Sequence, residues 1–206
     1  MSEALRVLLA GIVLGFSIAA PVGPIAMLCI RRSLQHGRRA GFVTGMGAAV
    51  ADTVYGAIAG FGLTGIAHFL EAQRRALGVA GAVLLVVIGV QLLRMRAAPD
   101  HEAVAPARIH SAFIGALFVT LTNPLTIVAF TAAFTGFRLV TAHDHASAAF
   151  LVAGVFVGAS SWWLLLSSVA ARYRERLDAR WMLNVNRIAG LVILACGLGA
   201  LIDLLR

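Results

Sequence analysis

Long apolar segments dominate this sequence and constrain its fold more than any other feature. Each is close to or above the roughly 18–20 residues that an α-helix needs to cross the hydrocarbon core of a bilayer. The segments are Val7–Ile30, Ala40–Leu70, Ala76–Leu93, Ser111–Phe137, Ala146–Ala171 and Ile188–Leu205. A soluble helical bundle would need charged faces on these segments, yet only 13% of all residues are charged and 60% are hydrophobic. We therefore predict an all-α integral membrane protein with six transmembrane helices.

The arginines predict the orientation of these helices. The chain carries a formal net charge of +8, and all of its basic residues are arginine. They cluster in short segments between the spans, which indicates topology and lipid contact rather than nucleic-acid binding. Twelve arginines fall in the loops 31–39, 94–110 and 172–187, against five on the other side. The positive-inside rule places these three loops in the cytoplasm and both termini outside. If segment 7–30 is re-entrant instead of spanning, the N-terminus lies inside.

The two halves of the chain can be aligned in the same order. Ala20–Ile30 aligns with Thr120–Phe130, Val43–Tyr55 with Val152–Leu164, and Gly78–Arg94 with Gly190–Arg206. We predict one transmembrane transporter domain, 1–206, in which repeat one (1–98) and repeat two (111–206) are joined by a linker (99–110). Three spans in each repeat force opposite orientations, and inverted repeats with broken helices are typical of secondary transporters.

Prolines interrupt the first and the fourth apolar segment. Pro21, Pro24 and Pro124 each remove a backbone donor, which costs about 3 kcal/mol or more inside a continuous helix. Proline is favoured at the first position of a helix, so Gly23–Pro24 and Asn123–Pro124 are predicted to begin new half-helices inside the membrane. The free N–H groups of such helix ends suit an anion such as a carboxylate. The alternative is a pair of ordinary proline kinks.

Asp52 is the acidic residue that points most strongly to function. It lies about a dozen residues beyond Arg39, roughly 18 Å along a helix, and so near the bilayer centre. A carboxylate there costs several kcal/mol to insert and should face an interior site, where it could balance an ammonium group or carry an exchanged proton. Tyr55, one turn along the same face, is a candidate hydrogen-bond partner. The alternative is a structural carboxylate bonded to Thr53 or Ser161.

Hydroxyl groups near the second break complete the predicted solute and ion site. They belong to Thr120, Thr122 and Thr126, and Ser161 joins them because the repeat alignment pairs it with Asp52.

Other polar and aromatic residues indicate neither a metal, nor a cofactor, nor catalysis. The stretch His143–His145 is more typical of a solvated loop than of a metal site. The adjacent Trp162 and Trp163 fit interfacial anchoring or helix packing better than a solute-stacking surface. The sequence contains no catalytic motif that would indicate an enzyme.

From Pro21 to Gly56 the sequence combines a proline–glycine–proline element, a basic segment, a glycine-spaced helix and an aspartate, and an Asn-Pro motif follows in Thr122–Phe130. In this combination the whole chain resembles the lysine exporter family of bacterial amino-acid efflux translocators. The resemblance implies export of a small amino acid or amino-acid derivative across the bacterial inner membrane, driven by the proton gradient. The positions that match the family motifs are Pro21, Gly23, Pro24, Asp52, Asn123 and Pro124.

Two other functions stay open beside amino-acid export. One is cation or metal efflux, which occurs in the same superfamily, and the other is a membrane interaction subunit that transports nothing. The expected partners are a small solute, a proton or other coupling ion, and the lipid bilayer. The sequence leaves the oligomeric state open, a homodimer included.

The predicted topology can be tested with reporter fusions. Fusions after Gly37 and Arg176 are expected to read cytoplasmic, and fusions after Gln73 and Asp144 are expected to read external, because the arginine-rich loops stay inside. Disagreement between the Gly37 and Arg176 fusions would contradict the six-span count.

Overall fold

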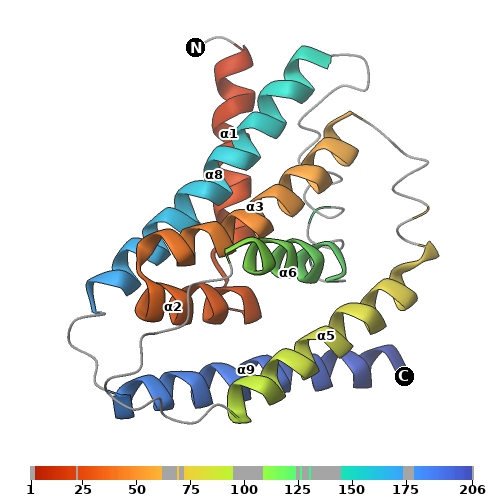
Figure 1. Ribbon diagram of the computed structural model, residues 1–206. Coiled ribbons are helices and arrows are strands. Elements are labelled where there is room, and N and C mark those ends of the chain that lie inside the picture. The colour runs from red at the N-terminus through yellow and green to blue at the C-terminus, as the bar shows by residue number, and fades with distance from the viewer. Residues whose placement is uncertain are drawn as a thin grey trace.

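The structure is a computed structural model that describes residues 3–21, 23–61, 69, 72–94, 109–123, 126, 130, 145–173 and 179–205. Seven helices account for most of these residues (Figure 1). They are α1 (Glu3–Ala19), α2 (Pro24–His36), α3 (Arg38–Gly60), α5 (Arg74–Arg94), α6 (Ile109–Leu121), α8 (His145–Arg172) and α9 (Ala179–Leu205). The all-α fold class is thus confirmed for the described residues. Pro124, His143 and Asp144 lie outside them.

The chain changes direction between α1 and α2. α1 ends at Ala19, α2 begins at Pro24, and the two helices are bent by 83°. Proline explains the interruption, because Pro21 has no N–H to donate to the carbonyl of Ser17 and its ring clashes with the preceding turn. The first apolar segment is therefore two helices at a steep angle rather than one.

A one-residue turn joins α2 to α3. Gly37 has a φ of 85°, which side chains with a Cβ rarely adopt, and its N–H donates to the carbonyl of Ser33 at 3.0 Å. The loop predicted at 31–39 is therefore helical except at Gly37, because α2 extends to His36 and α3 begins at Arg38.

α3 lies at the centre of a bundle formed with α2, α6 and α8 (Figure 1). Small residues let its neighbours approach closely. Gly45 lies against the side chain of Trp163 in α8, and Gly47 lies against the backbone of α6 at Phe113. A residue with a side chain at either position would push these helices apart.

α1 packs mainly along α8, and glycines on both helices form the contact. Gly11 lies against the backbone of α8 at Leu151, and Gly15 lies against it at Val155, so the two helices run in the same direction. Gly158 of α8 lies in turn against the backbone of α1. Glycines spaced four residues apart allow this close approach in membrane proteins.

α5 and α9 form a second, antiparallel pair, which lies below the bundle in the view of Figure 1. Gly78 lies against Leu204 at one end of the pair, and Gly89 lies against Leu194 towards the other. The pair meets the bundle largely through α2, where Met27 packs on a buried apolar core shared by α5 and α9.

The outer surface of the helices is apolar. Large exposed side chains occur on α1, α5, α6, α8 and α9, among them Val13, Val83, Ile114, Leu165 and Leu191. Such a continuous apolar surface indicates contact with lipid. Three helices, Arg75–Arg94, His145–Arg172 and Leu183–Leu204, are long and apolar enough to cross a membrane, and the bent pair of α1 and α2 makes a fourth if it is one span. The six-span arrangement of inverted repeats remains a prediction.

The contact between α1 and α8 predicts a stability effect at Gly158. A Cβ at this position would meet the carbonyl of Ile12 and the N–H of Phe16, so Gly158→Ala must separate the two helices. We expect a loss of about 1–3 kcal/mol of folding free energy, measured by thermal unfolding in detergent.

Gly115→Ala in α6 is the matched control, because a Cβ there meets nothing within 4 Å. Equal melting temperatures for the two variants would contradict the close packing of α1 on α8.

Candidate functional site

At the first helix break the start of α2 is half-buried at Gly23 and Pro24 and becomes fully buried at Ala26. Gly23 precedes the helix in an extended conformation, with φ −122° and ψ −164°, and Pro24 is its first residue. The carbonyl of Gly23 accepts the N–H of Met27 at 3.1 Å. The N–H groups of Ile25 and Ala26 have no carbonyl one turn earlier in α2, as is usual for a first helical turn. This end of α2 is therefore rich in backbone donors.

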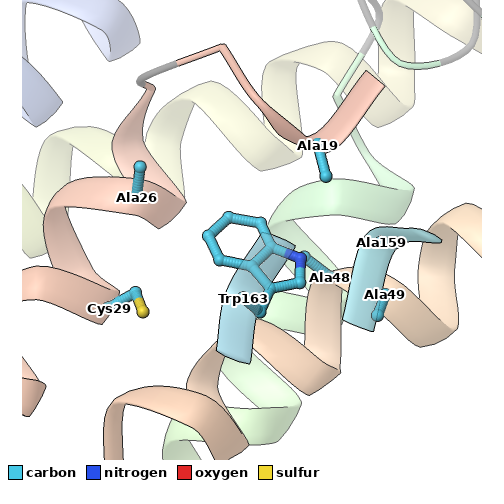
Figure 2. Close-up of a cluster of buried hydrophobic side chains, with 7 residues drawn as sticks. All are labelled: Ala19, Ala26, Cys29, Ala48, Ala49, Ala159 and Trp163. Atoms are coloured by element: carbon cyan, nitrogen blue, oxygen red, sulfur yellow. The ribbon is translucent and has the colours of Figure 1, made fainter. Parts of the chain in front are cut away.

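A cluster of small residues surrounds this break (Figure 2). Ala19 closes α1, Ala26 stands in the first turn of α2, and Ala48 and Ala49 come from the middle of α3. The indole ring of Trp163, from α8, lies between Ala19 and Ala26, with its nitrogen on the side towards Ala19 and Ala48 (Figure 2). Both ends of the break therefore meet α3 and α8.

Asp52 follows this cluster by one turn of α3. Its side chain is only 3% exposed. It lies on the stripe of α3 that faces α8, because Gly45 contacts Trp163 on one side of it and Gly56 contacts Val155 on the other. Within the described part of the chain, no hydrogen bond or ion pair to the Asp52 carboxylate is present. A buried carboxylate without a partner is costly, so its retention needs an explanation beyond packing.

The two structural partners considered for Asp52 are not in place. The hydroxyl of Thr53 donates to the carbonyl of Ala49 at 2.6 Å, within its own helix. Ser161 lies on the exposed side of α8 and donates to the carbonyl of Val157 at 2.7 Å. The structure therefore does not bring Ser161 and Asp52 together, although they occupy matching places in the repeat alignment.

The second break follows the end of α6 at Leu121. In a continuous helix the carbonyl of Thr120 would accept an N–H from residue 124, but that residue is proline and has none. The carbonyl instead accepts the N–H of Asn123 at 3.2 Å, and the carbonyl of Asn123 accepts that of Thr126 at 3.1 Å. The regular α-helical pattern thus ends at Asn123.

Tyr55 ties α3 to this second break. Its hydroxyl donates a hydrogen bond to the carbonyl of Leu121, the last residue of α6. Its ring stacks on Phe130 with 5.8 Å between ring centroids, and the side chain is buried. Ala49 contacts the first break and Tyr55 contacts the second, so Asp52 lies between the two breaks on α3.

The three threonines at the second break are buried, but two of them use their hydroxyl groups locally. Thr120 donates to the carbonyl of Ala116 at 2.9 Å, and Thr122 donates to that of Phe118 at 2.7 Å. Thr122 also lies against Gly81 of α5, which places it at the contact between α6 and the outer helix pair. Thr126 is 9% exposed.

Two polar features were not assigned to a site from the sequence. Trp163 is 3% exposed, and its indole nitrogen has no hydrogen-bond partner among the described residues, so it packs inside the protein instead of anchoring at an interface. Arg31 is buried rather than part of an exposed loop, and its Nε donates to Oδ1 of Asn186 in α9 at 2.6 Å. The contact between Arg31 and Asn186 could have been suspected from the sequence, because Asn184 and Asn186 are polar residues at the start of an apolar run.

Comparison with known proteins identifies the family. A sequence model of the LysE type translocator matches residues 16–204. The chain belongs to the LysE type translocator family. It is therefore a membrane transport protein rather than an enzyme, which confirms the resemblance seen in the sequence.

Two curated relatives match nearly the whole chain. A Bacillus subtilis protein named "Putative amino acid efflux protein YcgF" is 26% identical over 199 residues, covering 94% of each chain. The "Chemotactic transduction protein ChpE" of Pseudomonas aeruginosa is 28% identical over 205 residues, covering 96% of this chain and 97% of its own. No solved structure matches this translocator.

The link between Tyr55 and the second break predicts a stability effect in this LysE-type translocator. Tyr55→Phe keeps the stacking on Phe130 but leaves the carbonyl of Leu121 without its donor in a buried place. We expect a loss of about 1–3 kcal/mol, measured as a lower thermal midpoint in detergent.

The control for this change is Tyr173→Phe, because Tyr173 is 54% exposed at the end of α8. If both variants unfold at the wild-type temperature, the hydroxyl of Tyr55 does not stabilise the broken end of α6.

Proposed function

We propose that this LysE-type translocator is a secondary transporter that exports a small amino acid or amino-acid derivative across the bacterial inner membrane, coupled to proton movement. The observation that carries the proposal is the burial of Asp52, without a partner among the described residues, between two helix breaks. A charged residue inside a membrane bundle most often marks the path of a substrate or ion.

The groups around Asp52 fit the two charges of an amino acid. The carboxylate of Asp52 would balance the ammonium group, and the backbone donors at the start of α2 would receive the carboxylate group. Ala26, Ala48 and Ala49 belong to the buried cluster at the first break, and their small side chains favour a small solute. Tyr55 on the same helix and three threonines at the second break are also buried and complete the proposed site; the threonines are Thr120, Thr122 and Thr126.

The packing of the helices supports the proposed inverted repeats. In the repeat alignment α1 corresponds to α6, and α3 corresponds to α8. α1 packs along α8, and α6 packs along α3. The first predicted span of each repeat therefore packs on the second predicted span of the other repeat. α5 and α9 correspond to each other and pack together. A two-fold axis between the repeats would produce this exchange of partners.

The helix directions support the same arrangement. α3 and α8 are antiparallel, because Gly45 lies against Trp163 and Gly56 lies against Val155. α3 and α6 run in the same direction, since Gly47 meets the middle of α6 and Tyr55 meets its end. These directions are those expected if six spans alternate across the membrane in chain order.

The proton is the proposed coupling ion because a lone carboxylate can exist in two charge states. When the site is closed to water on both sides, a protonated Asp52 is neutral and costs little to bury. An ionised Asp52 can be buried in the closed site if the ammonium group of the solute is its partner. In an exchange cycle Asp52 would therefore be neutralised by the ammonium group while the solute is exported and by a proton while the empty site returns. The proposed cycle requires no other carboxylate inside the membrane.

The names of the two relatives favour different readings. The Bacillus subtilis relative is named for amino acid efflux, which supports the proposal. The Pseudomonas aeruginosa relative is named for chemotactic transduction, which favours an interaction subunit without a solute path as the second candidate function. Cation or metal efflux has less support, because the described residues contain no group of three or more His, Cys, Asp or Glu placed to hold a metal ion.

A flux assay separates these functions. The purified protein is reconstituted in proteoliposomes with an imposed proton gradient, and the movement of each of the common amino acids is followed with empty liposomes as the control. A survey of metabolites exported by cells with and without the gene would name derivatives outside this panel. Flux of an amino acid above the control supports the proposal, whereas no flux of any solute favours the interaction subunit.

The proposed role of Asp52 predicts the effect of two substitutions. Asp52→Asn keeps the shape of the side chain but removes its charge, so net export should be abolished while the protein stays inserted and folded. Asp52→Glu keeps the charge and should retain partial export, limited by the extra methylene group. Export rate and membrane abundance are measured together for both variants.

A structural role for Asp52 predicts the opposite pattern. Asp52→Asn would then be nearly silent, and Asp52→Glu would disrupt the protein by overpacking its buried site. Export by Asp52→Asn at the wild-type rate would remove Asp52 from the proposed mechanism.

A further inference from the structure

We propose that the indole N–H of Trp163 binds the carboxylate group of the transported solute at the first helix break. This inference rests on the proposed function, and it names the residue that would recognise the anionic end of an amino acid. Trp163 lies in α8 and shares a buried cluster with Ala19 of α1 and Ala26 of α2, on either side of the break (Figure 2).

The first argument is the unused donor. Three side chains of α8, Ser160, Trp162 and Trp163, hold buried polar atoms without a hydrogen-bond partner among the described residues. Trp163 is the most enclosed of the three, at 3% exposed. An indole can only donate, and a buried donor without an acceptor costs about 1–3 kcal/mol. A ligand with an acceptor group would remove this cost.

The second argument is the location of the donor. The ring lies in one buried cluster with Ala19, the last residue of α1, and Ala26, in the first turn of α2. Its nitrogen lies on the side of Ala19, where α1 ends at the break, and the N-terminus of α2, on the other side of the ring, offers backbone donors and the positive end of a helix dipole (Figure 2). The indole N–H and this helix end therefore favour the same kind of group, which is a negatively charged acceptor.

The third argument is what else could satisfy the indole. The ring shares its buried cluster with Ala19, Ala26, Cys29, Ala48, Ala49 and Ala159 (Figure 2). Apolar side chains, among them Ile25 and Phe42, pack against this cluster. Alanine side chains offer no hydrogen bond, and an ordered water needs two to four polar partners. A solute carboxylate brings two acceptor oxygens of its own and needs only donors from the protein.

The fourth argument is the distance along α3 to Asp52. Ala48 belongs to the same buried cluster as the indole, and Asp52 follows Ala48 by four residues on the same side of the helix. Asp52 therefore lies about one helical turn from the cluster that holds Trp163. This arrangement fits a small zwitterion, with its ammonium group at Asp52 and its carboxylate at Trp163. The negative charge of Asp52 would also prevent the reverse orientation.

Trp162 supplies a matched control. Its indole nitrogen also lacks a partner in the described residues, but the side chain is half-buried and its ring meets Phe16 of α1 edge-on, with 5.4 Å between centroids. Trp162→Phe and Trp163→Phe therefore remove the same N–H group from adjacent residues of one helix. Only the second removes it from the proposed carboxylate site.

The experiment measures ligand binding to the purified full-length protein. Thermal unfolding in detergent is followed with each common amino acid, and for those that stabilise the protein also with the corresponding amine, which lacks the carboxylate. Trp163→Phe is expected to weaken the apparent affinity for the amino acid by about ten- to a hundredfold and to leave that for the amine unchanged. Trp162→Phe is expected to bind both as the wild type does.

A second measurement keeps Trp163 intact in case Trp163→Phe does not fold. The variant Trp162→Phe/Trp181→Phe leaves Trp163 as the only tryptophan of the three in the chain. The fluorescence emission of this protein should shift when the amino acid is added and should not shift with the amine, because only the carboxylate accepts the indole N–H.

The outcomes distinguish the inference from the function on which it rests. If amino acids bind the wild type and Trp163→Phe equally well, or bind the single-tryptophan protein without changing its emission, the role of Trp163 is refuted and the export function stands. Equal weakening of amino acid and amine would show that Trp163 only shapes the bundle, which also refutes the inference. If no amino acid is bound or transported by the wild type, both proposals fail.

Discussion

The backbone of this protein is governed by one constraint, which is that polar groups released inside a membrane have no water to bind. Each broken helix releases carbonyls and N–H groups, and in hydrocarbon every unsatisfied one costs several kcal/mol. The second break meets this constraint through Tyr55, whose hydroxyl takes the last carbonyl of α6. A broken helix is therefore stabilised by a donor-bearing neighbour, and at the second break α3 supplies that neighbour.

The central place of α3 explains its composition. Glycine and alanine at Gly45, Gly47, Ala48 and Ala49 let α2, α6 and α8 approach its backbone, so both breaks can reach one helix. A helix of small residues is less apolar than one of leucine and valine, and α3 is not among the helices apolar enough to cross a membrane alone. Its surroundings are protein rather than lipid, and this allows it to carry Asp52.

Sequence reasoning reached the helix breaks but not all of their surroundings. The start of α2 at Pro24 follows from the missing N–H of proline, which is a local property of the chain. Helical spacing likewise places Tyr55 one turn from Asp52. Which side chains of another helix face the interior depends on the rotation of that helix, and residue spacing does not determine this rotation. In α8, Ser161 points out of the bundle and Trp163 points into it. The buried contact of Arg31 with Asn186 could not be predicted either. Counting charges to predict topology treats every arginine near a helix end as exposed.

Two buried groups without partners stand on facing helices, the acid of Asp52 and the donor of Trp163, and together they oppose folding. Burying such groups is unfavourable in a protein that only has to be stable, because apolar residues of similar size would pack there at no cost in hydrogen bonds. The cost is explained if the site is completed by a solute that brings the opposite groups. In the proposed mechanism the solute would satisfy both groups, and it would be released when a proton replaces its ammonium group at Asp52. Either a solute or a proton would then neutralise the charge of Asp52, which is the property that an exchange transporter requires.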